Sequence, residues 1–212
     1  ISGLGIIFHS SQMIDWKPQR GGDYEFISNL FEKYNSVWVD RVLSKTQIGG
    51  NWGKRNDIKN MMISVNMATF PERKDAFINS INNLLNIKII DTIRIYLNEY
   101  DSIPKEFPIN DRVIYVIGKE NLKDSGKFYW AGSNKDEYYF SVDDDLIYPE
   151  SYFIDHLISL NKYNNEIFVT LHGKEMQINP IAFNDNVKSY HCLRTVNNDV
   201  WINNGGTGVM AF

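Results

Sequence analysis

Three adjacent carboxylates, Asp143, Asp144 and Asp145, directly follow the strand-forming residues 138–142. Acids at the carboxyl end of a buried strand are costly, because like charges repel and lose their hydration there. Because side chains alternate along a strand, Asp143 and Asp145 are expected to face the same way and to share one divalent cation. Mg²⁺ and Mn²⁺ prefer such oxygen ligands, and with few protein ligands they complete their shell with phosphate oxygens. The triplet therefore predicts a metal site for a nucleotide-diphosphate substrate.

Composition narrows the class of protein. The chain has 212 residues, enough for one substantial domain. Its 22 Lys and Arg against 26 Asp and Glu give a net charge of −4, which argues against nucleic acid as a partner. Cys192 is the single cysteine, so we expect neither an intrachain disulfide nor a cysteine-rich zinc site. No apolar run approaches the roughly 20 residues of a membrane span and no secretory signal is present, so we predict a cytoplasmic protein without a transmembrane segment.

Strand and helix patterns alternate along most of the chain. The helix that begins near Pro71 has an apolar stripe at helical spacing, and the helix over 151–163 is expected to turn Phe153, Ile154, Leu157 and Ile158 inward. A short helix is predicted over 124–134. Residues 174–200 are predicted to be irregular, with one strand near 190–193. The remaining strands are predicted at 62–67, 92–97, 112–117, 138–142, 166–171 and 207–212.

This alternation predicts the α/β class, with a mostly parallel sheet flanked by helices. Ligands of such sheets bind at the carboxyl ends of the strands. Asn66, Asn98 and the acid triplet each fall at the end of a predicted strand. We therefore expect these polar groups to meet at one edge of the sheet.

The first 60 residues follow a different pattern. Residues 49–61 are rich in glycine and polar side chains and are predicted to be a linker. Residues 3–7 (GLGII) repeat the pattern of residues 206–210 (GTGVM). We therefore expect residues 1–48 to be the rear half of an upstream domain of the same kind. Residues 62–212 would be the front half of the next domain, truncated at its C-terminus.

Five segments stand out in order along the chain: 66–73 (NMATFPER), 95–100 (IYLNEY), 124–128 (DSGKF), 143–149 (DDDLIYP) and 206–209 (GTGV). A sixth, shorter one is 171–173 (LHG). Taken together, they resemble the nucleotide-sugar glycosyltransferases of the GT-A type. The likeness is closest to the α-N-acetylglucosaminyltransferases of bacterial heparosan capsule synthesis, and the exostosin-like transferases are more distant.

The resemblance implies a GT-A, Rossmann-like fold and a role for each matched side chain. Asp145 is implied as the principal ligand of Mn²⁺ or Mg²⁺, with Asp143 at the ribose or in the metal shell. Asp144 is implied to contact the donor sugar, which makes Asp144 and Asp145 the expected catalytic pair. The implied donor-binding residues are Asn66, Arg73, Asn98, Lys127, Asp143, Gly206, Thr207 and Gly208.

The implied reaction moves a sugar, N-acetylglucosamine by resemblance, from a UDP-sugar to an oligosaccharide or polysaccharide acceptor. It retains the configuration at the sugar carbon. A bacterial capsule or surface glycan is the expected product. Other capsule-synthesis proteins are implied as partners, and action at the inner face of the membrane is compatible with this role. The residues alone do not distinguish N-acetylglucosamine from glucose or galactose as the donor sugar.

Each matched residue also has an ordinary structural interpretation. Arg73 and Lys127 could be surface cations, and Asn98 could cap a loop. His172 could be a catalytic or acceptor residue, although a structural histidine at a strand end is favoured. Two other functions stay open: a non-catalytic or truncated sugar-nucleotide-binding domain of a larger polymerase, and a sugar nucleotidyltransferase. The last is disfavoured because the first strand is not followed by a glycine-rich basic loop.

Overall fold

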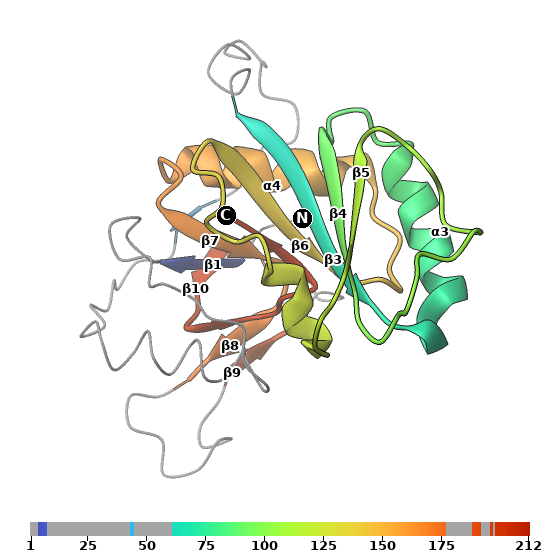
Figure 1. The fold of residues 1–212 in the computed structure, drawn as a ribbon. Coiled ribbons are helices and arrows are strands. Elements are labelled where there is room, and N and C mark those ends of the chain that lie inside the picture. The colour runs from blue at the N-terminus through green and yellow to red at the C-terminus, as the bar shows by residue number, and fades with distance from the viewer. Residues whose placement is uncertain (1–3, 8–42, 45–60, 177–187, 192–195, 197) are drawn as a thin grey trace.

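A mixed sheet forms the centre of the molecule in the computed structural model, which describes residues 4–7, 43–44, 61–176, 188–191, 196 and 198–212 (Figure 1). Within these residues the sheet has nine strands in the order β2-β10-β1-β7-β12-β6-β3-β4-β5, and β11-β8-β9 form a second, small sheet. The α/β class is thus confirmed. The strands are β1 (Leu4–Ile7), β2 (Leu43–Ser44), β3 (Met62–Thr69), β4 (Thr92–Leu97), β5 (Val113–Ile117), β6 (Glu137–Val142), β7 (Ile167–Thr170), β8 (Gly173–Glu175), β9 (Lys188–Tyr190), β10 (Asn198–Trp201), β11 (Asn204–Gly205) and β12 (Val209–Ala211).

Parallel pairing is concentrated in one half of the large sheet. Strands β6, β3, β4 and β5 are parallel neighbours, and this half carries the acid triplet. In the other half β12 runs antiparallel to both β6 and β7, and β1 is antiparallel to β7 but parallel to β10. The expectation of a mostly parallel sheet therefore holds for the half that matters to the site.

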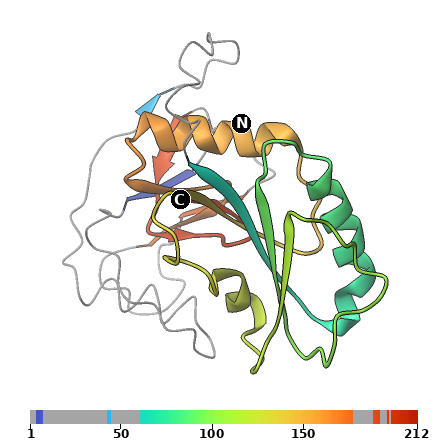
Figure 2. The same ribbon diagram turned by 45° about the horizontal axis from the view of Figure 1, so that its top comes forward.

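Helices cover the two faces of the sheet unequally (Figures 1 and 2). The longer helices α3 (Lys74–Leu85) and α4 (Glu150–Lys162) lie on one face, where both contribute to a single apolar cluster with the strands. The opposite face carries η3 (Lys123–Phe128), a 3₁₀ helix, and a second 3₁₀ helix, η2 (Pro71–Arg73), leads into α3. Each residue of β6 is buried, as expected for a strand covered on both sides.

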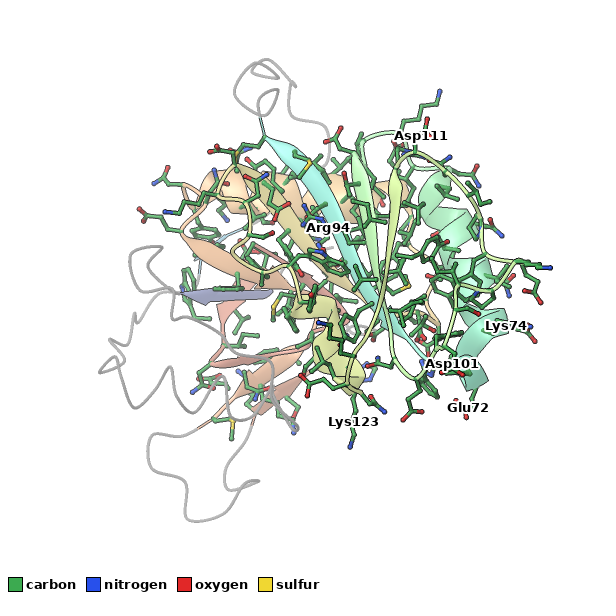
Figure 3. All side chains as sticks on the ribbon, viewed as in Figure 1. Glu72, Lys74, Arg94, Asp101, Asp111 and Lys123 are labelled. Atoms are coloured by element: carbon green, nitrogen blue, oxygen red, sulfur yellow. The ribbon has the colours of Figure 1, made fainter. Side chains whose placement is uncertain are left out.

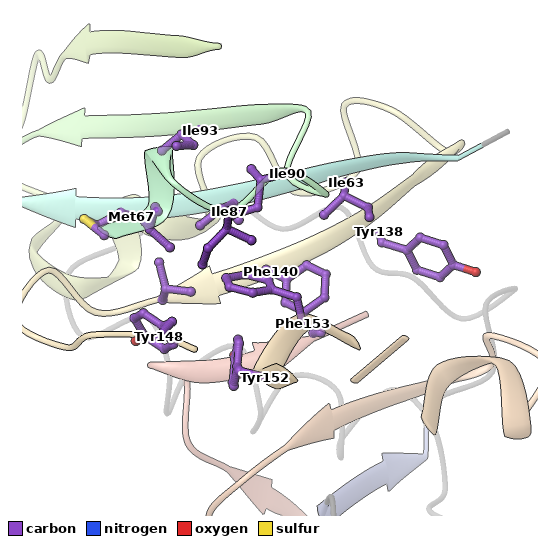
Figure 4. Packing of buried hydrophobic residues seen from close by; sticks show 14 of the residues in the cluster. Ile63, Met67, Ile87, Ile90, Ile93, Tyr138, Phe140, Tyr148, Tyr152 and Phe153 are labelled. Carbon is purple, nitrogen blue, oxygen red and sulfur yellow. The ribbon is translucent and has the colours of Figure 1, made fainter. Parts of the chain in front are cut away.

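Strand alternation separates an apolar face from a polar one. On β3, Ile63, Val65 and Met67 point into the cluster beneath α3 and α4, part of which is drawn in Figure 4. The intervening Ser64 and Asn66 are buried on the η3 side. That side also holds an ion pair between two strands: Arg94 on β4 and Glu137 on β6 meet through two nitrogen–oxygen contacts of 3.0 and 3.2 Å.

The inner face of α4 differs from its prediction. Phe153 and Leu157 are buried as expected, but Ile158 is 38% exposed and Ile154 is only half-buried. His156 and Leu160, four residues apart on α4, are buried on the inner face instead. Apolar residues alone suggested the wrong stripe, because a buried imidazole can donate its one N–H to a backbone carbonyl. The ring nitrogens of His156 lie 2.7 Å from the Tyr152 carbonyl and 3.3 Å from the Val209 carbonyl.

The buried His156 predicts a specific pH dependence of stability. Burial lowers the pKa of His156 to about 4, against 6.5 in the unfolded chain. The unfolded state therefore binds a proton first as the pH falls below 6.5, and folding weakens until about pH 4. The expected loss of unfolding free energy between about pH 7.5 and 5 is about 2 kcal/mol from this residue. Urea unfolding at both pH values checks it. His156→Gln should show a smaller difference by that amount, and an unchanged difference would contradict the assignment.

The predicted helix over 124–134 is wrong in length and type. The structure has the six-residue 3₁₀ helix η3, followed by turns to residue 133. Gly126 explains how η3 sits so close to the sheet, because a Cβ there would lie 2.7 Å from the Tyr96 ring and 3.1 Å from the Ala68 side chain. Close approach to the strands thus fixes the position of Lys127, the next residue.

The remaining sequence predictions fall partly inside and partly outside the residues that the structure describes. The strand near 190–193 appears as β9, which ends at Tyr190, and residues 192–195 lie outside the described ones. Most of residues 1–48 and of the predicted linker 49–61 also lie outside them, so the proposed division into domains stays a prediction. Of the first part of the chain the structure describes β1 and β2, which both pair within the large sheet. Among the described helices, none is long and apolar enough to cross a bilayer.

Candidate functional site

Asp143, Asp144 and Asp145, here called the acidic turn, lie just beyond the last residue of β6, Val142. The predicted strand alternation does not reach them, because Asp144 and Asp145 belong to a turn. The expectation that Asp143 and Asp145 face the same way therefore loses its basis. The three carboxylates are instead graded in exposure: the Asp144 side chain is 5% exposed, while those of Asp143 and Asp145 are 36% and 43% exposed.

Arg73 closes one side of the acidic turn. Its Nη1 lies 2.8 Å from Asp144 Oδ1 and 2.8 Å from Asp145 Oδ2. The hydrogen bond to Asp144 is the main reason that the pKa of Arg73 is raised, so the guanidinium is always charged. The position of Arg73 follows from η2, which ends at this residue as the chain enters α3.

α3 also fixes the chain that follows the acids. Ser80 Oγ donates to the carbonyl of Leu146 at 2.8 Å, and the Tyr148 amide donates to Asn83 Oδ1 at 2.9 Å. Both helix residues are polar positions next to the apolar stripe. The acidic turn is thus anchored by β6 on one side and by α3 on the other.

Lys127 occupies the other side of the acidic turn. Its Nζ lies 2.6 Å from Asp143 Oδ1 and 2.6 Å from Asp124 Oδ1, and its side chain is only 1% exposed. Burial alone would lower the pKa of Lys127, but the two carboxylates more than offset this effect and raise it. The surface-lysine interpretation is therefore wrong, because this ammonium is an internal link between η3 and the acidic turn.

Gly206, Thr207 and Gly208, here called the glycine turn, pack against the same carboxylate. A Cβ at Gly208 would lie 1.8 Å from Asp143 Oδ2, so a larger residue here would displace the Asp143 carboxylate. Thr207 Oγ1 donates to Asp124 Oδ2 at 2.9 Å, and Ser141 Oγ donates to the Thr207 carbonyl at 2.5 Å. The structure thus brings the glycine turn, η3 and the acidic turn together.

Tyr148 ties the glycine turn to the acidic turn. Its hydroxyl accepts from the Asp143 amide at 2.8 Å and donates to the Gly208 carbonyl at 2.6 Å. Burial raises the pKa of this hydroxyl, so it stays protonated and keeps both bonds. The sequence did not single out Tyr148, although its place in the Tyr-Pro pair after the acids was a usable signal.

Asn98 follows β4 at the expected edge, but it supports a loop. Its Oδ1 accepts from the Leu122 amide at 2.8 Å and its Nδ2 donates to the Lys123 carbonyl at 3.0 Å. Lys123 has a φ of 52°, a strained value for a lysine. Asn98 is 2% exposed, so in this state it holds the loop that leads into η3 and leaves no surface for a base or a ribose.

The placement of Asn66 at the sheet edge is a wrong prediction. Strand β3 continues to Thr69, because Ala68 and Thr69 stay paired with Tyr96 and Leu97 of β4. Asn66 is therefore an interior residue with no exposed surface, and its Nδ2 donates to Ser64 Oγ and to the Phe140 carbonyl. It does not reach the site.

Asp124, which sequence reasoning did not assign to the site, and His172, for which it favoured a structural role, are both neighbours of the site. Asp124 lay within the matched segment before Lys127, and its two contacts now make it a full member of the cluster. His172 lies against Gly206, where a Cβ would come within 1.7 Å of its Nε2. Partial burial lowers the pKa of His172, so it is a neutral imidazole beside the Asp143–Lys127 pair.

The charges of the cluster do not cancel. Four carboxylates, those of Asp124 and of the acidic turn, face the two cations Arg73 and Lys127, which leaves two negative charges in excess. An approaching diphosphate would meet repulsion from this excess. A divalent cation would neutralise it, which is the electrostatic condition for binding a diphosphate here.

The donor set limits the kind of metal site that is possible. Within the described part of the chain, no three His, Cys, Asp or Glu side chains converge as a ready-made metal site. Asp143 and Asp145 offer the hard oxygen donors that Mg²⁺ and Mn²⁺ prefer, and both are partly exposed. These residues therefore fit a cation that takes one or two protein ligands and fills its shell with phosphate and water oxygens. They do not fit a cation held by protein alone.

No family model and no curated protein matches this chain.

Proposed function

We propose that residues 62–212 form the donor-binding part of a metal-dependent glycosyltransferase of the GT-A type. The reaction would transfer a sugar from a UDP-sugar to an oligosaccharide or polysaccharide acceptor, with retention of configuration. The observation that carries the proposal is the cluster at the carboxyl edge of the parallel strands. There Arg73, Lys127 and the glycine turn surround three successive carboxylates, two of them partly exposed.

The chemistry of sugar transfer suits these residues. As the bond between the sugar and the diphosphate breaks, negative charge accumulates on the leaving diphosphate. A bound Mn²⁺ or Mg²⁺ would neutralise part of that charge as a Lewis acid. Asp145, the most exposed acid of the turn, is the residue that would hold the metal, with Asp143 contributing to its shell. Arg73, 41% exposed, is the cation able to turn toward the phosphates.

Three of the expected roles change in this proposal. In the ligand-free structure the Asp144 side chain is too buried for a donor sugar to reach it. We therefore assign Asp144 to holding Arg73 in place. Lys127 is enclosed by Asp124 and Asp143, so we assign it to positioning Asp143. Asn98 is likewise assigned to holding the loop that leads into η3. The glycine turn keeps its expected place beside the donor sugar, where its lack of side chains permits close approach.

N-acetylglucosamine as the donor sugar, a capsule or surface polysaccharide as the acceptor, and other capsule-synthesis proteins as partners belong to this proposal. They rest on the ordered sequence segments, not on the geometry. The glycine turn is the place to test the sugar. A site shaped for the N-acetyl group should discriminate between UDP-N-acetylglucosamine and UDP-glucose in binding.

A non-catalytic sugar-nucleotide-binding domain is the second candidate. One observation favours it: Asp144, one of the two residues expected to be catalytic, has a side chain only 5% exposed and lies 2.8 Å from Arg73. Such a domain would bind UDP with a metal but would not release UDP from a UDP-sugar. A nucleotidyltransferase is not supported, because β3 is followed by Phe70 and Pro71 instead of a glycine-rich basic loop.

Calorimetric titration with UDP, with and without Mn²⁺, tests the binding site. We expect heat of binding with Mn²⁺ and little or none without it, because of the excess negative charge of the cluster. Release of UDP from UDP-N-acetylglucosamine then separates the enzyme from the binding domain. Absence of UDP binding under both conditions would contradict both candidates.

A further inference from the structure

Three buried polar atoms lie at the carboxyl edge of the sheet on the side of α3. Within the described part of the chain, Asp144 Oδ2, the Tyr100 hydroxyl and Thr69 Oγ1 have no hydrogen-bond partner. A buried polar group without a partner is costly, and a buried carboxylate oxygen especially so. Three such atoms near one site call for a common explanation.

The backbone brings these residues close together. In the parallel register of β3 and β6, Asn66 lies opposite Ser141, and both chains continue to the same edge of the sheet, β3 as far as Thr69 and β6 into the turn that holds Asp144. The Asn98 amide donates to the Thr69 carbonyl at 2.9 Å, which brings the chain leading to Tyr100 to the same point. Burial first, and the Asp144 carboxylate next, raise the pKa of Tyr100.

The ring of Tyr100 is held rigidly. It packs edge-on against Phe107 with the ring centres 5.7 Å apart, and Phe107 packs on Phe77 of α3 at 4.6 Å. A phenol fixed by its ring but without a partner for its hydroxyl is a preformed hydrogen-bond donor. Asp144 Oδ2, at the same edge of the sheet, is a buried acceptor that also lacks a partner among the described residues.

Movement of Arg73 would create a need for this donor. It is the cation paired with Asp144, and it is the exposed member of that pair. If Arg73 turns toward a bound diphosphate, the Asp144 carboxylate is left buried without its charge partner, which usually costs several kcal/mol. A hydroxyl that then donates to Asp144 would lower the cost of moving Arg73.

We propose that Tyr100 is a positioning residue. Its hydroxyl donates a hydrogen bond to the Asp144 carboxylate when Arg73 moves away from that carboxylate. The Asp144 carboxylate exchanges partners: Arg73 holds it through Oδ1 in the ligand-free protein, and Tyr100 donates to Oδ2 when Arg73 is engaged with diphosphate. The exchange rests on the proposed function for its ligand. Its internal step, from Arg73 to Tyr100, is a property of the protein alone.

A double-mutant cycle on the ligand-free protein tests the internal step. In the wild type Tyr100→Phe removes a hydroxyl without a partner, so the urea midpoint should not fall. In Arg73→Gln the hydroxyl has become the donor to Asp144, so adding Tyr100→Phe should lower the midpoint clearly. Tyr152→Phe is the matched control. It also removes a buried hydroxyl without a described partner, and its effect should not depend on residue 73.

Ligand affinity gives the second readout. For the complete chain with Mn²⁺ and UDP, Tyr100→Phe should weaken UDP binding about tenfold, while Tyr152→Phe leaves it unchanged. Equal effects of Tyr100→Phe on the urea midpoint of the wild type and of the Arg73→Gln variant would overturn the exchange, as would unaltered UDP affinity. Failure of the wild type to bind UDP would instead contradict the proposed function, and the stability cycle would still decide the exchange.

Discussion

Asp145→Ala is expected to abolish Mn²⁺-dependent UDP binding while the protein stays folded. Asp145 is the most exposed carboxylate of the acidic turn and the one assigned to hold the metal. Loss of the metal would leave the diphosphate facing an unneutralised acidic cluster. We expect UDP affinity to fall at least about 100-fold, equivalent to about 3 kcal/mol. Titration calorimetry with saturating Mn²⁺ measures it.

Asp111→Ala is the matched control for this substitution. Asp111 is an exposed acid before β5, at the edge of the sheet opposite Lys123, Asp101 and Glu72 (Figure 3). The control removes the same charge from the chain without touching the acidic turn. UDP affinity that falls equally in both variants would show a general charge effect and would contradict a metal site at Asp145.

The second large effect concerns the stability of the buried ammonium. In Lys127 the cation is enclosed, whereas its partners Asp124 and Asp143 are partly open to water. Replacing both acids by asparagine leaves a buried charge without an opposite charge. We expect this double variant to lose about 3–5 kcal/mol of unfolding free energy in urea, without metal or nucleotide.

Lys127→Met identifies the source of that loss. Added to the double variant, it removes the unpaired charge and keeps a side chain of similar length, so most of the lost stability should return. Alone, Lys127→Met should cost less than the loss of both acids, because water reaches the two carboxylates it leaves behind. If Lys127→Met fails to restore stability to the double variant, the loss does not come from a buried ammonium.

Local patterns were sufficient to predict the parallel half of the sheet. Strands β4 and β6 are short apolar runs with clear ends, and each was located to within one residue. The order of elements then located the acid triplet at the carboxyl edge. What the patterns could not predict was how far pairing continues, so β3 runs past Asn66 to Thr69 and removes Asn66 from the site.

The partners of the site residues depend on tertiary packing. Nothing in the sequence around Lys127 indicates that Gly126 brings η3 against Tyr96 and so buries the lysine. The exposure of Arg73 and the burial of Asp144 likewise follow from the arrangement of η2, α3 and β6. For the same reason His156 was missed inside α4, because its carbonyl partner Val209 lies on β12. The residue types were therefore sufficient to predict where the site lies, whereas the partner of each side chain depends on packing.

The position of Mn²⁺ in crystals grown with UDP tests the central claim most directly. The anomalous signal of Mn²⁺ locates the ion independently of any assumption about the ligand. We expect one peak that joins the Asp145 carboxylate to the diphosphate, with Arg73 turned toward the phosphates and the glycine turn beside them. A Mn²⁺–UDP complex bound elsewhere on the protein, with Arg73 still paired to Asp144 and Asp145, would contradict it.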